Sequence, residues 1–351
     1  MNAEFFDAIA DIEREKGISR EYMKEKITQA LLSAYKKDNP ECGDNIVIVM
    51  DDEKKRIDMF LRMDVVEEVE DPKTQMLLET AQNYSKRAKV GGVIEIPVDT
   101  KKFGRIAAQA AKQVIIQGIR EAERGIIYDE FTSKEQEILT GTVIRIEPRT
   151  GSVSIKISSN SEFTEAMLSP KEQIKGEHLV EGDMIKVYVV EVRKSTRGPQ
   201  VLISRTHPGL VKRLFELEVP EIFDGIVEIK SIAREPGSRT KIAVWSVDED
   251  VDPIGACVGP KGGRVAGIVD ELGGEKIDIV KFSEQPEEYI AAALSPAEVI
   301  EVTMLDEAKS CRVIVPDNQL SLAIGKEGQN VRLAAKLTGY KIDIKPESEA
   351  Y

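Results

Sequence analysis

Residues 254–265 read IGACVGPKGGRV, and residues 320–332 read LSLAIGKEGQNVR. Each stretch holds a Gly-x-x-Gly tetrapeptide, at 259–262 in the first and at 325–328 in the second, between two short segments with a helical pattern. A glycine-rich turn that opens a helix offers free backbone N–H groups and the positive end of the helix to an anion. Both stretches therefore predict a phosphate-binding loop.

The spacing excludes the loop of nucleotide-binding proteins, which requires G-x-x-x-x-G-K-[ST]. Counting from Gly255, the sixth position is Pro260, and counting from Gly259 it is Arg264. No serine or threonine follows Lys261 to hold magnesium, and G-x-G-x-x-G is absent around Gly325 as well. The expected phosphate therefore belongs to a nucleic-acid backbone rather than to a nucleotide.

The two stretches are parts of an internal repeat. The first copy runs TKIAVWSV, PIGACVGPKGGRVAGIVDELGG and EKIDIV, and the second runs CRVIVPD, LSLAIGKEGQNVRLAAKLTG and YKIDIK. Each copy follows a predicted helix (LVKRLFEL or EEYIAAAL) and a predicted strand (IVEIKSIA or EVIEVTML). The order helix, strand, strand, helix, helix, strand thus occurs twice, which predicts two duplicated modules at 207–283 and 284–351.

This order resembles the prokaryotic type of KH module, whose Gly-x-x-Gly loop clamps about four nucleotides of RNA backbone. A single such loop is more often a simple helix corner, but two copies in matching context favour KH modules. The predicted RNA contacts are Gly259, Pro260, Lys261, Gly262, Gly263 and Arg264 in the first copy, and Gly325, Lys326, Glu327, Gly328, Gln329, Asn330 and Arg332 in the second. Because the linker at 282–287 is short, we expect the two grooves to form one RNA track.

Residues 131–206 carry five short strand patterns, from ILTGTVIRIEP to PQVLISR, with little helix between them, which predicts a small barrel. The segment resembles the S1 domain, an OB-fold barrel that binds single strands. We expect its basic face to include Arg145, and the predictions for RNA contact are Arg193, Lys194, Arg197 and Arg205. A solvated loop explains the charges of 193–197 equally well. Phe163 and Tyr188 either stack on bases or belong to the core.

Residues 1–130 predict an α+β unit. Ser19 is the expected N-cap of a helix with Met23, Ile27, Leu31 and Ala34 on one face, and DDEKKR at 51–56 is the expected tip of a hairpin. A short helix is expected at 75–84, and a long alanine-rich helix begins near residue 103. Nothing in the region has catalytic spacing, so we interpret it as an interaction domain.

The composition limits the function classes. The 351 residues carry a net charge of −13, so any nucleic-acid site is a local patch on an acidic body. The three cysteines form no C-x-x-C pair, and the two histidines are far apart, which argues against a zinc site or a disulfide framework. We expect no cofactor and no metal. The first residues do not resemble a signal peptide, and no apolar run approaches a membrane span, so we expect a cytoplasmic protein.

The whole arrangement is similar to the NusA family of bacterial transcription elongation, termination and antitermination factors. The resemblance rests on the domain order, on the opening EFFDAIADIEREKGISRE, and on the segment from RGPQVLISRTHPGLVKRLFEL to IGACVGPKGGRV. It implies a non-enzymatic monomer that binds RNA polymerase through 1–130 and nascent single-stranded RNA through the S1 and KH domains. It also implies effects on pausing, intrinsic termination and antitermination, together with other Nus factors.

Two alternatives remain open at this stage. An RNA-processing enzyme can carry S1 and KH modules, but it needs a further domain with clustered carboxylates or histidines. Residues 1–130 contain no histidine, and the nearest candidate for an acidic motif, DDE at 51–53, is better explained by the hairpin tip. A ribosome-associated protein is the second alternative, because KH modules also occur there.

Overall fold

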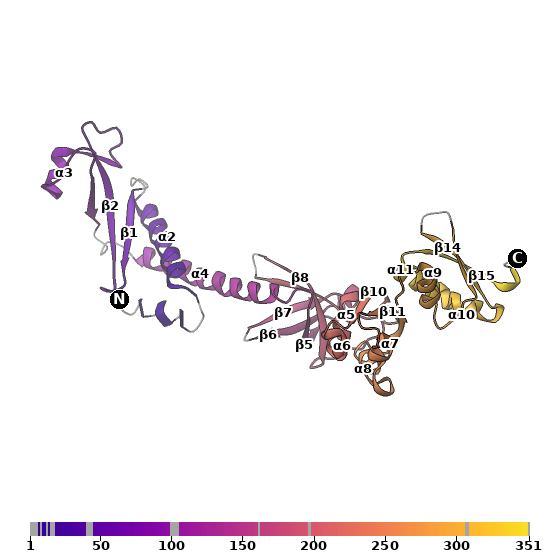
Figure 1. The fold of residues 1–351 in the computed structure, drawn as a ribbon. Helices are drawn as coiled ribbons and strands as arrows, with labels where there is room; N and C mark the ends of the chain where they lie inside the picture. Colours follow the sequence, from indigo (N-terminus) through magenta and orange to yellow (C-terminus); the bar gives the residue numbers. More distant parts are fainter. Residues whose placement is uncertain are drawn as a thin grey trace. The chain divides into compact units, whose positions relative to one another are not determined.

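The chain forms two compact units, residues 1–126 and 127–351, in the computed structural model (Figure 1). The structure describes residues 6–7, 9–11, 13–14, 18–39, 45–98, 105–160, 162–195, 198–305 and 309–349. Within these residues, no helix combines the length and the apolar character needed to cross a membrane. The two units are described separately.

The first unit is a four-stranded sheet with helices. Its elements are helix α2 (Arg20–Asp38), strands β1 (Ile46–Asp51), β2 (Arg56–Val66) and β3 (Gln75–Leu77), helix α3 (Leu78–Tyr84), strand β4 (Val93–Pro97) and the start of helix α4 (Arg105–Thr132). Strand β2 is central, antiparallel to β1 and β4 and parallel to β3. The expected hairpin is confirmed, with Asp51 opposite Arg56. The expected helix at 75–84 is partly wrong, because its first three residues pair with β2.

The local signals for α2 are also confirmed. The Ser19 hydroxyl accepts a hydrogen bond from the N–H of Tyr22 at 3.3 Å, as an N-cap does. Met23 and Ile27 are each 1 % exposed and lie in one apolar cluster with Ile9 and Ile18. The helix therefore forms because a cap and an apolar face coincide in the sequence.

The second unit begins with a closed barrel. Its strands are β5 (Ile138–Ile146), β6 (Val153–Ser159), β7 (Glu162–Leu168), β8 (Met184–Arg193) and β9 (Gln200–Ser204), with a 3-10 turn η2 (Pro170–Glu172). The hydrogen-bonded order is β7-β6-β5-β8-β9, and β7 also lies against β9, so the sheet closes on itself. The predicted five-stranded barrel is confirmed. Gly141 lies where β5 passes so close to Ile155 and Ile157 that a side chain would clash.

The barrel includes the last turn of α4. Phe131 is fully buried in the barrel core, and the Glu130 carboxylate accepts hydrogen bonds from Ser159 and Asn160 at 2.5 and 2.6 Å. Glu130 precedes the boundary expected at 130/131, and the second compact unit starts at Ile127.

Two modules of the same topology follow. The first contains helices α5 (Pro208–Glu218) and α6 (Pro220–Phe223), strands β10 (Val227–Glu235) and β11 (Arg239–Ser246), helices α7 (Pro253–Val258) and α8 (Gly263–Glu271) and strand β12 (Lys276–Lys281). The second contains α9 (Pro286–Ala293), β13 (Glu301–Met304), β14 (Ser310–Val315), the 3-10 turn η4 (Asp317–Gln319), α10 (Leu320–Ile324), α11 (Gln329–Thr338), β15 (Lys341–Pro346) and the 3-10 turn η6 (Glu347–Glu349). In each sheet the middle strand is antiparallel to the first and parallel to the last. The predicted duplication is confirmed.

The two modules share one core. Ala243 of β11 and Val280 of β12 lie in the same apolar cluster as Leu294 and Leu333 of the second module. The fully buried Lys241 ammonium donates to the Asp278 carboxylate at 2.8 Å and to the Ser295 carbonyl at 2.6 Å. Burial lowers the pKa of Lys241, which the nearby Asp278 charge partly offsets. The bond from the buried Lys241 to the Ser295 carbonyl crosses the junction and, with the shared core, holds one module against the other.

Candidate RNA interface

The first Gly-x-x-Gly loop joins α7 to α8. The Asp252 carboxylate caps α7 by accepting hydrogen bonds from the N–H groups of Ile254 and Gly255 at 3.1 and 3.0 Å. The helix ends at Val258 with Gly259 as its C-cap, and a single 3-10 turn η3 (Pro260–Gly262) leads into α8. The N–H groups at the start of α8 are therefore presented at an exposed corner, where an anion can reach them.

The second loop repeats this backbone closely. Gly325 has φ 77° and ψ 170°, where Gly259 has φ 72° and ψ 176°. A 3-10 turn η5 (Lys326–Gly328) follows, and Glu327 takes the positive φ of 54° that Lys261 takes in the first loop at 52°. The same backbone therefore presents different side chains.

The first and the second glycine of each Gly-x-x-Gly loop have different structural roles. Gly259 and Gly325 adopt a conformation that is essentially restricted to glycine, and an added Cβ would lie 2.5 Å from Arg264 Cγ or 2.7 Å from the Asn330 nitrogen. Gly262 also has positive φ, but an added Cβ there would meet nothing within 4 Å. The first glycine of the loop is thus closely packed, while the second leaves the backbone open to a ligand.

Charge in the first loop comes from Lys261. Its side chain is exposed and forms no ion pair with any described residue. Arg264, by contrast, uses its Nη1 group internally, donating to the Glu221 carboxylate at 2.9 Å and to the Ala256 carbonyl at 2.6 Å. Lys261 is therefore the stronger of the two predicted phosphate contacts, and both stay predictions.

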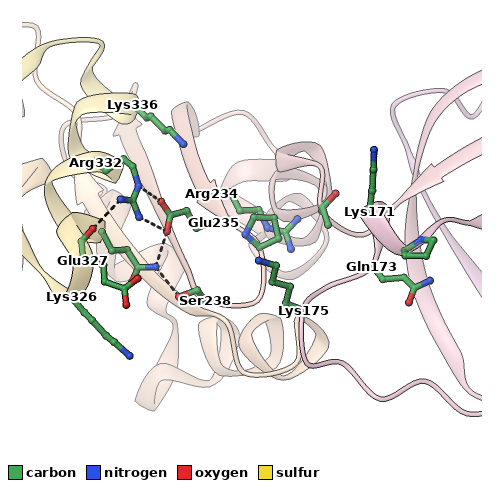
Figure 2. A pocket seen from close by; sticks show the side chains of 14 residues that line it. Lys171, Gln173, Lys175, Arg234, Glu235, Ser238, Lys326, Glu327, Arg332 and Lys336 are labelled. Atoms are coloured by element: carbon green, nitrogen blue, oxygen red, sulfur yellow. Dashed lines mark hydrogen bonds and ion pairs between the residues drawn. The ribbon is translucent and has the colours of Figure 1, made fainter. Parts of the chain in front are cut away.

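Two of the predicted contacts at the second loop, Gln329 and Arg332, are bonded to the first module (Figure 2). Arg332 Nε donates to the Glu235 carboxylate at 2.6 Å, and Gln329 Nε2 donates to Glu235 at 2.9 Å and to the Ser238 hydroxyl at 2.7 Å. The hydrogen bond from Arg332 holds the pKa of Glu235 below its ordinary value, and that from Gln329 adds to the effect. This Glu235 bridge was missed by the sequence analysis, because no local pattern links β10 to α11.

Asn330 corrects one prediction. Its side chain is 3 % exposed, and its amide donates to the carbonyls of Leu294 and Ala323 at 2.9 and 3.0 Å. A side chain that is enclosed in this way cannot reach a ligand, so Asn330 braces the loop from inside instead of contacting RNA.

Arg205 corrects another prediction. It is 1 % exposed, and its guanidinium donates to the carboxylates of Glu177 at 2.5 Å and of Glu271 at 3.1 Å. Glu177 belongs to the barrel and Glu271 to α8, so Arg205 joins the barrel to the first module. It offers nothing to solvent, and the basic face of the barrel does not include it.

Three further basic residues that the sequence places on the basic face of the barrel lie at its surface. Arg145 is exposed, Arg193 pairs with Glu191 at 2.6 Å, and the Lys194 ammonium lies 4.4 Å from the centre of the Tyr128 ring. The hydrogen bond between Arg193 and Glu191 lowers the pKa of the latter. Arg197 lies outside the described residues.

The structure separates the two aromatic candidates of the barrel. Phe163 is 61 % exposed, and the Lys156 ammonium lies over its ring, 4.4 Å from the ring centre. Tyr188 is 7 % exposed and stacks on His207 with ring centroids 4.7 Å apart. Phe163 is therefore accessible to a base, whereas Tyr188 belongs to the core. The alternation of β7 and β8 residues alone does not distinguish them.

Across the described ranges, no group of three or more His, Cys, Asp or Glu side chains could hold a metal ion. Cys257 of α7 is fully buried, and burial raises the pKa of its thiol to about 12. Its role is to fill the core beside the first loop.

Comparison with known proteins places the domains in one family. Residues 4–125 match the model of the NusA N-terminal domain, residues 205–282 that of the NusA-like first KH domain, and residues 286–351 that of the NusA-like second KH domain. The prediction that residues 131–206 form an S1 domain is not tested by these matches.

Similarity to individual proteins extends over the whole chain. The transcription termination/antitermination protein NusA of Halalkalibacterium halodurans is 54% identical over 350 residues, which cover 100% of this chain and 90% of that protein. NusA of Bacillus subtilis is 54% identical over 351 residues and is covered to 92%. The solution structure of the B. subtilis NusA N-terminal domain matches 36% of this chain at 46% identity and a TM-score of 0.31, with that domain fully covered. The chain belongs to the NusA family of transcription termination/antitermination proteins.

Proposed function

We propose that this factor binds RNA polymerase through residues 1–130 and holds nascent single-stranded RNA on its barrel and KH modules. By holding the transcript it prolongs pausing, favours intrinsic termination and takes part in antitermination with other Nus factors. The proposal assigns binding and no catalysis to the chain.

One observation carries the RNA part of the proposal. The two Gly-x-x-Gly loops have the same backbone, each with an open second glycine and a solvent-exposed lysine, Lys261 or Lys326. Such a loop lets a sugar-phosphate chain approach the main chain while the lysine neutralises a phosphate. A duplicated loop with this geometry is suited to a repeating polyanion.

The junction between the modules supports a single track. Because the modules share a core and the Glu235 bridge, the second loop keeps its orientation to the first. At about four nucleotides for each KH module, the pair holds about eight nucleotides in a preorganised path. Preorganisation lowers the entropic cost of ordering a flexible RNA.

The effect on transcription follows from tethering. A factor bound to polymerase keeps its RNA site close to the emerging transcript, which raises the effective concentration of the site to the order of mM for a short link. A modest RNA affinity is then sufficient. This explains how a chain with a net charge of −13 avoids non-specific binding to nucleic acid and still captures one transcript.

The RNA part is tested by charge reversal in each loop. Pro260 and Lys261 are replaced by two aspartates in one variant, and Lys326 and Glu327 in a second variant. We expect each to bind single-stranded RNA at least tenfold more weakly, because aspartate tolerates the positive φ but repels phosphate. Circular dichroism checks the fold. Unchanged affinity in both variants would overturn the proposed clamp.

The polymerase part is tested with purified polymerase in a pause assay. The full chain is compared with residues 127–351, which keep Phe131 and Glu130 in the barrel. We expect the shortened protein to bind RNA normally and to lose its effect on pausing and its co-purification with polymerase. Retention of both by the shortened protein would contradict the assignment of polymerase binding to the first unit.

A further inference from the structure

A cavity of about 570 Å³ lies beside the linker between the two modules, within the second compact unit. We call it the Trp245 cavity. Its lining comes from Trp245 near the end of β11, from residues 281–284, and from Glu288 and Ala292 of α9. The volume is in the range of about 300–1,000 Å³ that is typical of ligand sites. The lining contains no residue of either Gly-x-x-Gly loop, so the proposed RNA clamp does not account for this cavity.

One wall of the cavity is the indole of Trp245, the only tryptophan of the chain. Trp245 lies on the same face of β11 as Ala243, which belongs to the core shared with the second module. The indole is half-buried, and the Lys230 ammonium lies 4.6 Å from the ring centre while it pairs with Glu228. Lys230 does not line the cavity. The indole therefore binds a cation of its own chain and still contributes surface to the cavity.

The opposite part of the lining is held in place by hydrogen bonds and packing. The Phe282 N–H donates to the Val244 carbonyl at 2.8 Å, and the Phe282 ring meets the buried Tyr289 ring edge-on, with centroids 5.0 Å apart. The Ser283 hydroxyl donates to the Glu288 carboxylate at 2.8 Å. The aromatic wall and one carboxylate are thus preorganised, which lowers the entropic cost of binding a ligand.

The charge around the cavity is strongly negative. Its lining holds Glu284 and Glu288 against Lys281, and neither carboxylate forms an ion pair within the described residues. Residues 246–252 and 283–288, at the ends of β11 and β12, contain seven acidic residues and no lysine or arginine. This field attracts cations and repels the phosphates of a nucleic acid. The expected ligand is therefore a cation rather than RNA.

The combination of an indole with carboxylates selects one kind of cation. A planar guanidinium stacks on an aromatic ring and donates to carboxylates through a rigid fork, whereas an ammonium is a compact point charge. The cavity is larger than one side chain, and the acidic segments extend beyond its lining, so the ligand is a chain segment with several cations. Tryptophan and arginine are also the residues that most often anchor protein interfaces.

We infer that the Trp245 cavity receives an arginine side chain from a basic segment of a partner protein. The indole of Trp245 is the stacking surface, and Glu284 and Glu288 accept hydrogen bonds from the guanidinium. This inference goes beyond the proposed function, because it adds a protein contact to modules to which that function assigns only RNA.

Two capped octapeptides test the preference for arginine, one of alternating arginine and glycine and one of alternating lysine and glycine. Both carry the same positive charge. Calorimetry with the full chain measures affinity, and Trp245 fluorescence reports binding at the cavity. We expect the arginine peptide to bind about fivefold more tightly than the lysine peptide, and Trp245→Leu to remove most of this preference. Equal affinities of the two peptides for the unmodified protein would overturn the inference, because general attraction to an acidic surface would then explain the binding.

Two double variants test the carboxylates. E284Q/E288Q neutralises the cavity, and E347Q/E349Q removes two exposed carboxylates of η6 that lie outside the lining. Both variants lose the same charge, and a glutamine at 288 still accepts from Ser283. We expect the arginine peptide to bind E284Q/E288Q about tenfold more weakly than E347Q/E349Q, with circular dichroism unchanged. Equal binding to the two variants would contradict the inference even if Trp245→Leu failed to fold.

Single-stranded RNA of about 8 nucleotides, which two KH modules can fill, tests the alternative ligand. We expect this RNA to leave the Trp245 fluorescence unchanged and to bind E284Q/E288Q and E347Q/E349Q equally. If the RNA quenches the indole and binds E284Q/E288Q more tightly than the control, the cavity takes a nucleobase, and the inference is wrong.

Discussion

The two Gly-x-x-Gly loops share a backbone but differ in what holds them and in what they present. In the first loop Lys261 occupies the exposed position of positive φ, and in the second Glu327 occupies it. The first loop is braced by Arg264, which stays within its own module, while the second is bonded to Glu235 of the other module. The two copies therefore share the loop backbone and differ in the electrostatics and the attachment of the loop.

This difference suggests a division of tasks. In the proposed RNA clamp, the first loop would supply charge and the second a fixed direction for the RNA strand, because helix α11 is tied to β10. The two loops share their backbone because Gly259 and Gly325 have a positive φ at which any other residue would be strained. The side chains differ at Lys261 and Glu327, where the backbone requires only a residue that tolerates a positive φ.

The largest effect is expected for Gly325→Ala. The backbone at Gly325 is essentially restricted to glycine, and the new Cβ would lie 2.7 Å from the backbone nitrogen of Asn330, which cannot move away. We expect a loss of about 3 kcal/mol of unfolding free energy. Gly259→Ala should cost less, about 2 kcal/mol, because the atom it meets belongs to the flexible Arg264 side chain.

Urea unfolding followed by circular dichroism measures both losses. Gly267→Ala in α8 is the matched control, because Gly267 has open space around it and lies in a regular helix. We expect this control to stabilise the protein by about 0.5–1 kcal/mol. If Gly259→Ala proved as costly as Gly325→Ala, the two loops would be equally rigid and the packing argument would be wrong.

The second prediction compares the internal braces. Asn330→Ala removes the donor to two buried carbonyls, so we expect a loss of about 2–3 kcal/mol in unfolding free energy. Arg264→Ala removes bonds that are half-buried and that water can replace, so about 1 kcal/mol is expected. Thermal unfolding of the two variants tests this order, and the reverse order would mean that the first loop is the more tightly braced.

The sequence predicted what is local. Glycine spacing and the repeated strand and helix patterns located both loops and both modules, because turn and helix preferences depend on neighbouring residues. Arg205 and Asn330 were assigned wrongly for the opposite reason. Arg205 is buried by Glu271, 66 residues away, and Asn330 bonds to Leu294, 36 residues away. Burial of a polar residue is decided by partners that the local pattern does not contain.

The barrel shows the same limit at single positions. Its strands were predictable from alternation, but the exposure of Phe163 and the burial of Tyr188 depend on which segments cover the sheet. Tyr188 is covered by His207 from the start of the first module.

The third prediction removes the attachment of the second loop. Glu235→Gln should cost about 1 kcal/mol of unfolding free energy at pH 7, because Arg332 loses a charged partner at a partly exposed site. The pKa of Glu235 is below its ordinary value of 4.5, since Arg332 and Gln329 bond to the carboxylate. Its stabilisation is therefore complete above about pH 4.5 and is lost as the pH falls through the lowered pKa.

Thermal unfolding at pH 7 and at pH 3 tests this dependence. The difference between the unmodified protein and Glu235→Gln should shrink at the lower pH, because protonation of Glu235 removes the charge that glutamine lacks at every pH. A difference that stays constant would show that the hydrogen bonds, and not the charge, hold the second loop to the first module. In that case the contacts of Glu235 with Arg332 and Gln329 would remain, but the charge of Glu235 would not contribute to holding the second loop.

The smallest effects are expected when the charges of the two loops are neutralised one at a time. Lys261→Gln should weaken binding of single-stranded RNA about threefold to fivefold and lower the salt slope by about 0.7, because one phosphate contact is lost. Glu327→Gln should strengthen binding about twofold at low salt, and the gain should vanish as salt screens the exposed carboxylate. The two substitutions occupy equivalent positions of the two loops, so RNA affinity should change in opposite directions because the two side chains carry opposite charges. If Glu327→Gln weakened binding instead, its carboxylate would be an acceptor for a base amine, and the second loop would contribute sequence preference where the first contributes charge.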